Sequence, residues 1–381
     1  TLPKMRKFDN FLTFTNYFGL FLTIYYPMKH KKLTITAASL LTAFTAQVQA
    51  GFYDWQGGTS SDWSDNSNWQ GGNGVGAADT APIYNSGVTM APASVLSGSA
   101  SVTRVWLGNQ SAPESGALTV QSGATLSTSG DFIVSQNSTL ASSGAISVGN
   151  GNGMIVRDSG NVTLNSGATL NKLTLSENST ATLNAGSSVT TIQSLSNNAQ
   201  LTMNNTYSSN LTMNNTSSLT VNGTLNGSFG IGSTAMQYIG EGGTVNGDIE
   251  LNGSDQMTVA GNVNGRFSLN QTSQAIIEAT ANILSNSGNS WIYNTAAVTW
   301  NVGADGSVGT LRTNRSETSL DAYDGEWRYD ASAADMVVDL SNYEADGSSI
   351  SLQLVSGIQN ESAFASNVTF LRNGSDITSD F

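Results

Sequence analysis

Residues 201–225 read LTMNNTYSSNLTMNNTSSLTVNGTL and decide the fold. The stretch holds three apolar–Thr–apolar triplets, at Leu201–Met203, Leu211–Met213 and Leu219–Val221. A period of two turns both apolar side chains of a triplet to one side of a strand and the threonine to the other. Because Asn or Gly follows each triplet at once, the strands must be very short. Strands of this kind need partners elsewhere to bury their apolar sides.

Similar triplets recur through the middle of the chain. Among them are Leu118–Val120, Phe132–Val134, Ile146–Val148, Met154–Val156, Val162–Leu164, Leu173–Leu175, Ile249–Leu251, Met257–Val259 and Phe267–Leu269. The phrase SGATL also repeats, at 122–126 and 166–170. Self-similarity of this kind indicates a solenoid, in which stacked coils join their apolar sides into one core. An antiparallel sandwich, the competing architecture, usually has longer strands joined by hairpins. No window shows the apolar spacing of a helix.

The sequence therefore predicts an all-β chain with a single-stranded right-handed parallel β-helix over residues 91–285. Roughly 20 residues per coil would give about eight coils between residues 115 and 285. We expect Asn residues at the turns to adopt left-handed backbone and to stack into ladders. Open strands at the ends of a solenoid promote aggregation, so both ends need caps. We assign residues 51–90 to a Trp-rich N-terminal cap with the first coil, and residues 286–381 to a C-terminal β region.

The N-terminal cap region contains Trp55, Trp63 and Trp69 among Gly, Asp and Asn residues. Two interpretations are open for them. Buried indoles could seal the end of the coil, and exposed indoles could form a platform on which sugar rings stack. Packing is the more common use of Trp in proteins.

The sequence pattern of the N-terminal part of the chain predicts export. From Met28 the sequence has Lys29, Lys31 and Lys32, then a short apolar run, then small residues that end at Ala50. This is the layout of a signal peptide over residues 28–50, with cleavage after Ala50. An uncleaved membrane anchor is the alternative. Residues 1–27 are expected to be upstream sequence or an extended leader; their apolar part, 11–26, is at the short limit for a membrane helix.

Composition excludes several classes of function. The chain has no Cys, and its one His, His30, lies in the predicted signal peptide. Disulfides, Cys/His metal sites and Cys- or His-based catalysis are therefore excluded from residues 51–381. These residues carry 26 acidic and eight basic side chains, a net charge of −18. Such acidity disfavours nucleic acid and anionic membranes as partners. We expect neither cofactor, metal nor membrane insertion in this part.

The tryptophans follow the pattern W-x-G-G-(x)4-W-(x)3-S-N-W over residues 55–69. This pattern resembles the N-terminal region of bacterial secreted β-helical proteins of the autotransporter-passenger and PEP-CTERM-sorted type. WNVGADGSVGTL at 300–311 and MVVDLSNYEADGSSISLQLVSG at 336–357 resemble their closing segments. The resemblance implies a secreted or cell-surface protein. The Pro-Glu-Pro motif of the sorted members does not occur in the sequence, which leaves the mode of surface attachment open.

Candidate catalytic or metal-binding groups are few. Asp248 and Glu250 lie two residues apart, on one side of a strand, with Arg266 roughly one coil later. Paired carboxylates can do acid–base work or hold Ca²⁺, but a solvated polar face is the simpler interpretation. A second acidic group, near Trp327 and Tyr329, reads as a solvated loop; its acids are Asp321, Asp324, Glu326 and Asp330. No catalytic, cofactor-binding or metal residues are assigned.

The sequence thus favours an exported, non-catalytic structural or adhesin-like protein whose partners are extracellular polysaccharide or other surface proteins. Two alternatives stay open. One is a carbohydrate-active β-helix enzyme, a polysaccharide lyase or hydrolase. The other is a carbohydrate- or ice-binding module, the latter because outward Thr ladders occur in ice-binding solenoids.

Overall fold

The computed structural model of the chain divides into two units, residues 1–50 and 51–381. In the first unit it describes β1 (Thr23–Ile24) and β2 (Leu33–Thr34), which pair antiparallel. The predicted leader, the signal peptide and its cleavage site after Ala50 otherwise lie outside the described residues. In the second unit the described residues are 54–56, 60–70, 80–83, 93–108, 115–286, 290–313, 327–329, 336–344, 350, 352–355, 358–359 and 361–380.

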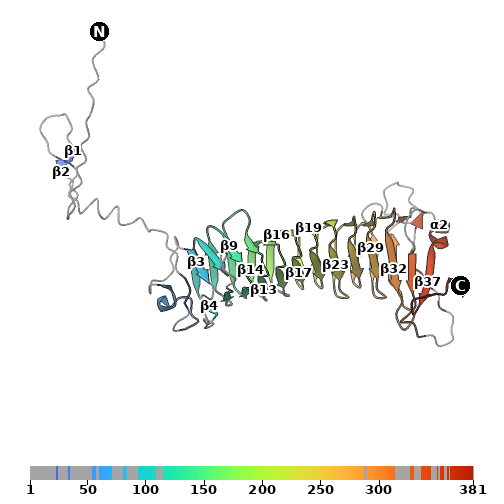
Figure 1. Ribbon diagram of the computed structural model, residues 1–381, viewed down its shortest axis with the longest axis horizontal. Helices are drawn as coiled ribbons and strands as arrows, with labels where there is room; N and C mark the ends of the chain where they lie inside the picture. Colours follow the sequence, from blue (N-terminus) through green and yellow to red (C-terminus); the bar gives the residue numbers. More distant parts are fainter. Residues whose placement is uncertain are drawn as a thin grey trace, which may run out of the picture. The chain divides into compact units, whose positions relative to one another are not determined.

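The second unit is a stack of coils whose strands line up side by side (Figure 1). The first sheet contains 14 strands, 13 of them stacked one coil above the next. They are β4 (Ser94–Leu96), β7 (Ala117–Val120), β10 (Thr139–Ser142), β13 (Asn161–Leu164), β15 (Thr180–Leu183), β17 (Gln200–Met203), β20 (Ser218–Val221), β23 (Met236–Ile239), β26 (Gln256–Val259), β29 (Gln274–Ile277), β32 (Ala297–Asn301), β35 (Met336–Asp339), β37 (Val368–Arg372) and, as a final hairpin partner, β38 (Ser375–Asp376).

The second sheet has 16 strands. Its main path is β3 (Thr80–Ile83), β6 (Arg104–Leu107), β9 (Phe132–Val134), β12 (Met154–Val156), β14 (Thr169–Leu175), β16 (Ser188–Leu195), β19 (Leu211–Asn215), β22 (Phe229–Ser233), β25 (Ile249–Leu251), β28 (Phe267–Leu269), β31 (Ser290–Ile292), β34 (Trp327–Tyr329) and β36 (Ile358–Gln359). A branch of β5 (Ser99–Val102), β8 (Thr125–Thr128) and β11 (Ala145–Val148) joins it at β14.

A third sheet of six strands occupies the later coils. Its strands are β18 (Thr206–Tyr207), β21 (Thr224–Leu225), β24 (Thr244–Val245), β27 (Asn262–Asn264), β30 (Asn282–Ser285) and β33 (Thr310–Thr313). The described helices are short: η1 (Asn66–Asn68), α2 (Glu361–Ser366) and η3 (Thr378–Asp380).

The register confirms the predicted parallel β-helix. Among the described strands of the second unit, all named pairs are parallel except β37 with β38. Between residues 115 and 286, strand partners in neighbouring coils are 18 to 24 positions apart, close to the 20 expected. Later coils are longer, with 38 positions between Val298 and Met336. The first sheet places nine strands, β7 to β29, where about eight coils were expected. Parallel stacking continues past residue 285, from β29 through β32 and β35 to β37.

The apolar members of the triplets build one continuous core. Leu140 of β10 pairs in register with Leu118 below and Val162 above, and all three are almost fully buried. The same alignment repeats from coil to coil, so short strands that could bury little alone share one interior.

The turns that lead into the first sheet also repeat. Four of them have two consecutive residues at positive φ, between 48° and 64°: Gln136–Asn137, Asp158–Ser159, Glu177–Asn178 and Asn197–Asn198. Two positive φ values define a type I′ turn, which Asn tolerates well. The residues that directly follow four strands of this sheet form a ladder of hydrogen-bonded amide side chains, Asn165–Asn184–Asn204–Asn222, with bonds of 3.1, 3.2 and 2.9 Å. The predicted Asn ladders and left-handed turns are therefore present.

Candidate functional site

The outward side of the first sheet is free of charge over a long distance. In each strand from β7 to β32 two side chains point away from the core in two columns, and we call these residues the uncharged face. They are Ala117, Thr119, Thr139, Ala141, Asn161, Thr163, Thr180, Thr182, Gln200, Thr202, Ser218, Thr220, Met236, Tyr238, Gln256, Thr258, Gln274, Ile276, Ala297 and Thr299. Ten strands contribute to it in a chain of net charge −13.

Threonine dominates one column of this face. Thr163, Thr182, Thr202 and Thr220 pair in unbroken register from β13 to β20. β-branched Thr suits an exposed strand position, because its branched side chain packs well on a pleated surface. The hydroxyl and methyl groups together make this part of the face amphipathic and regular.

Three large apolar side chains interrupt the threonine and amide pattern. Met236, Tyr238 and Ile276 are exposed by 59%, 41% and 38%, and they are the exposed large hydrophobic residues of the described chain. All three lie on the uncharged face, on β23 and β29. With the intervening Gln256, Thr258 and Gln274 they form a block of three strands by two columns. We call these six residues the apolar patch. Exposed apolar side chains that lie close together form a candidate interaction site.

Strand β23 departs from the usual arrangement, in which apolar side chains point inward and polar side chains outward. Gln237 points into the core, with 5% of its surface exposed, between Leu219 of β20 and Met257 of β26. Within the described part of the chain, neither polar atom of its side-chain amide has a hydrogen-bond partner. Burying an unpartnered amide is unfavourable, as is exposing Met236 and Tyr238. A strand that does both departs from what stability alone would select.

Sequence reasoning assigned Thr to the outward side but missed the apolar patch. The signal was the run MQYI at 236–239, where the apolar–polar–apolar order of Met236, Gln237 and Tyr238 predicts that Met and Tyr face inward. The neighbouring coils fix the opposite register, with Gln237 opposite Leu219. A shift of one residue exchanges the two sides of a strand, so the local pattern could not decide the matter.

The structure brings Asp248, Glu250 and Arg266 together on the second sheet. Arg266 contacts Asp248 at 3.9 Å and Glu250 at 3.7 Å, and its backbone N–H donates to Asp248 at 2.9 Å. The side chains keep between 35% and 49% of their surface exposed. One guanidinium thus engages both carboxylates, and at this exposure such ion pairs contribute little to stability. The arrangement is that of a surface ion-pair cluster.

Two other carboxylates have displaced pKa values for structural reasons. Glu177 stands at a turn above Asp158; desolvation, then a hydrogen bond and repulsion from Asp158, raise the pKa of Glu177 above its usual 4.5. Asp255 is buried and accepts the N–H groups of Ala235 at 2.9 Å and Asn252 at 3.0 Å. Burial raises the pKa of Asp255, although these two bonds act in the opposite direction. Because Asp255 joins one coil to the next, its role is structural.

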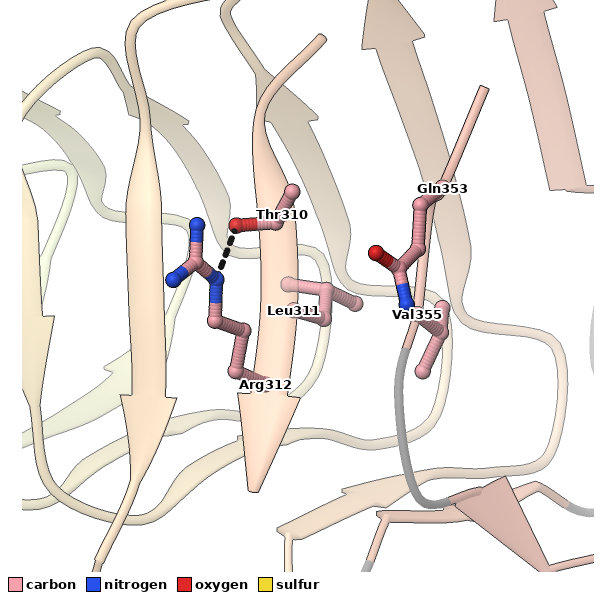
Figure 2. Close-up of a pocket in the computed structure, with 5 residues that line it drawn as sticks. All are labelled: Thr310, Leu311, Arg312, Gln353 and Val355. Carbon is pink, nitrogen blue, oxygen red and sulfur yellow. Dashed lines mark hydrogen bonds between the residues drawn. The ribbon is translucent and has the colours of Figure 1, made fainter. Parts of the chain in front are cut away.

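One pocket opens beside β33, and Figure 2 shows its lining. It has a volume of about 280 Å³ and is lined by Thr310, Leu311, Arg312, Gln353 and Val355. The Nε of Arg312 donates to the hydroxyl of Thr310 at 2.9 Å, and Leu311 bridges to Val355 in parallel. Among the described residues that line the pocket there is no carboxylate, and β33 belongs to a different sheet from β25, which carries Glu250.

The three predicted cap tryptophans are buried, with 4%, 5% and 1% exposure for Trp55, Trp63 and Trp69. Trp69 meets the other two rings edge to face, with centroid distances of 5.1 and 4.8 Å. Its Nε1 donates to the carbonyl oxygen of Trp63 at 2.9 Å. The N–H of Trp63 donates to the carbonyl of Val95 in β4 at 2.9 Å, which ties the cluster to the first sheet. Sugar stacking needs an open ring face, so this burial favours the sealing interpretation.

The remaining sequence candidates add no site. The acids Asp321, Asp324, Glu326 and Asp330 lie outside the described residues. Within the described ranges, no group of three or more His, Cys, Asp or Glu side chains is placed to hold a metal ion. A search of the same ranges found no helix with the length and hydropathy needed to cross a membrane. Comparisons with known protein families, with curated proteins and with solved structures found no match.

Proposed function

We propose that the chain is an exported, non-catalytic structural or adhesin-like protein of the bacterial cell surface or extracellular space, and that it binds through the uncharged face. The observation that carries the proposal is the position of Met236, Tyr238 and Ile276 on this one face. A long rigid rod with a flat, neutral binding surface suits attachment better than turnover of a small substrate, for which enzymes use concave sites. The signal-like residues 28–50 support export.

A carbohydrate-active enzyme is the second candidate, because two carboxylates and an arginine converge at Asp248, Glu250 and Arg266. General acid–base catalysis needs one group that can donate a proton and one that can accept it. One guanidinium contacts both carboxylates, so the geometry does not give the two acids distinct roles. Loss of glycan degradation in Glu250→Gln, with surface binding unchanged, would favour this candidate.

The test uses a bacterial host that expresses the full chain. Protease accessibility on intact cells, together with assay of the medium, reports export. Retention of the cells or of the released protein on surfaces coated with cellulose, xylan or host cell-envelope protein reports adhesion. We expect export, and retention that Thr258→Glu abolishes because it places a charge in the centre of the apolar patch. The matched control is Thr244→Glu, because Thr244 is half-buried like Thr258. It should keep retention, because Thr244 lies on the third sheet and not on the uncharged face.

Two results would overturn the proposal. The first is a chain that stays inside the cell, protected from protease. The second is retention that Thr258→Glu leaves at the wild-type level, because the face would then not be the binding surface. Release of soluble sugars from cellulose or xylan would transfer support to the enzyme.

A further inference from the structure

We propose that the uncharged face docks on the same face of a second copy of this chain, so that the protein forms a weak homodimer centred on the apolar patch. The inference rests on the proposed function, because it names the partner of the same face.

The absence of charge makes this face suitable for contact between copies. The chain carries a net charge of −13, so two copies repel each other in most relative orientations. Over the described strands β7 to β32 the two outward columns contain no ionisable carboxylate, Lys or Arg. Charges stand at the edges: Glu278 directly follows β29 and accepts a hydrogen bond from Asn301 at 3.0 Å. The centre of a protein interface is depleted of charge, as this face is, and Tyr and Met, which stand here on β23, are favoured there.

One column of the apolar patch, Tyr238–Thr258–Ile276, suits a two-fold contact between identical copies. Tyr238 and Ile276 occupy one column and flank Thr258, one strand away on either side. A two-fold axis along β26 through Thr258 reverses the rod and keeps the columns aligned. Tyr238 of each copy then lies over Ile276 of the other, and the contact occurs twice. In such an interface each residue pair is repeated by the symmetry.

The size of the face fits a weak, reversible dimer. Five strands of the uncharged face, from β20 to β32, are symmetric about β26. At about 4.8 Å between strands and about 13 Å of strand length, each copy offers roughly 300 Å² of projected area. The two copies together would bury about 600 Å², which is below the size of a stable dimer and implies a transient contact with a dissociation constant of about 100 µM or more. Two flat sheets can pack face to face about 10 Å apart with interdigitating side chains.

The inverted strand β23 supports a role in binding over one in folding. Its register leaves Gln237 in the core without a partner among the described residues, and turns Met236 and Tyr238 outward. A monomer gains nothing from either placement. A second copy that covers Met236 and Tyr238 recovers the apolar burial that the monomer lacks.

Sedimentation velocity of the purified full chain tests the proposal at concentrations from about 10 µM to about 1 mM, a range that brackets the affinity expected for this area. We expect wild type to shift from monomer to dimer across the range. Thr258→Glu and Thr258→Lys should each stay monomeric, because each places two like charges against one another at the two-fold axis. An equimolar mixture of the two variants should form the dimer again. Thr244→Glu, on the third sheet, should dimerise like wild type.

A second pair of variants keeps the face neutral, in case a charge disturbs folding. Ile276→Thr and Tyr238→Thr restore the residue that dominates the column, and each should weaken association by about tenfold. Circular dichroism should give the same spectrum and melting temperature for all variants as for wild type.

The proposal is overturned if wild type is monomeric throughout, or if folded Thr258→Glu dimerises normally. If wild type is monomeric and Thr258→Glu still abolishes retention on cellulose, xylan or cell-envelope protein, the face serves another partner. In that case the proposed function stands and the second copy is rejected. If wild type dimerises but Thr258→Glu keeps surface retention, the second copy is the partner of the face and the proposed surface binding through this face is rejected.

Discussion

Replacing Gln237 with Leu should stabilise the protein, against the usual direction of core substitutions. Its amide is 5% exposed and lies between Leu219 and Met257, with no hydrogen-bond partner among the described residues. Mutational data place the free-energy penalty of burying such an amide at about 1–3 kcal/mol. A buried leucine would also gain about 1.5–3 kcal/mol of apolar transfer free energy. After some loss to imperfect packing, we expect Gln237→Leu to raise the free energy of unfolding by about 2–3 kcal/mol.

Urea unfolding followed by circular dichroism measures this change, and the melting temperature should rise by roughly 5 °C. Solenoids can unfold in parts, so the comparison requires equal slopes of the unfolding curves. The reciprocal variant Leu201→Gln is the control, because it introduces an amide at the same inward position two coils earlier. It should lower stability by about 3–5 kcal/mol, the sum of lost burial and an unpartnered amide. If Gln237→Leu is neutral or destabilising, the amide of Gln237 makes a favourable interaction and the argument for an inverted strand fails.

Three other substitutions test separate parts of the structure. Tyr207→Phe removes the hydroxyl that accepts the Ile192 N–H at 2.7 Å, so the buried amide should exchange hydrogen faster and stability should fall by about 1–3 kcal/mol; unchanged exchange at Ile192 would contradict this. Glu177→Asn should gain in melting temperature over wild type as the pH rises above 4.5, because a carboxyl whose pKa is raised in the folded state costs stability once it ionises. The difference between the two proteins should shrink at lower pH, and a difference that does not change with pH would refute the raised pKa of Glu177. Trp69→Ala should destabilise by about 3–5 kcal/mol and promote aggregation, because Trp69 is 1% exposed at the capped end; a soluble variant of wild-type stability would show that the cluster does not seal the coil.

The parallel β-helix could be predicted from the sequence because its signal is local and repeated. A triplet such as Val162–Leu164 is enough to predict the strand, its inward side chains and its outward threonine. The turn residues that follow predict where the strand ends. Repetition then leaves stacking as the only common way to bury these pairs. The same local rules predicted the Asn ladders, because Asn at a repeated turn meets Asn in the next coil.

The third sheet and the ion-pair cluster were outside the reach of these rules. β18 and β21 have two residues each, below the length at which alternation can be recognised. The meeting of Arg266 with Asp248 and Glu250 depends on the number of residues in the intervening coil. Coil length varies, from 18 residues between Leu201 and Leu219 to 38 between Val298 and Met336. Sequence spacing could therefore place Arg266 about one coil later but could not align it with the two acids.

The apolar patch was missed for a different reason, and that reason bears on function. In most strands the local pattern and the register imposed by neighbouring coils agree, which is the condition for a stable and unique fold. At β23 they conflict, since Met236 and Tyr238 satisfy the inward pattern but stand outward at 59% and 41% exposure. A strand that followed stability alone would place hydroxyl or amide side chains at these positions, as β17 and β20 do. Conflicts of this kind concentrate where a protein binds something, because the partner supplies the burial that the isolated chain lacks. The conflict at β23 and the exposure of Ile276 two strands away therefore point to the same contact, and the symmetry of the two about Thr258 is what favours a second copy as the partner.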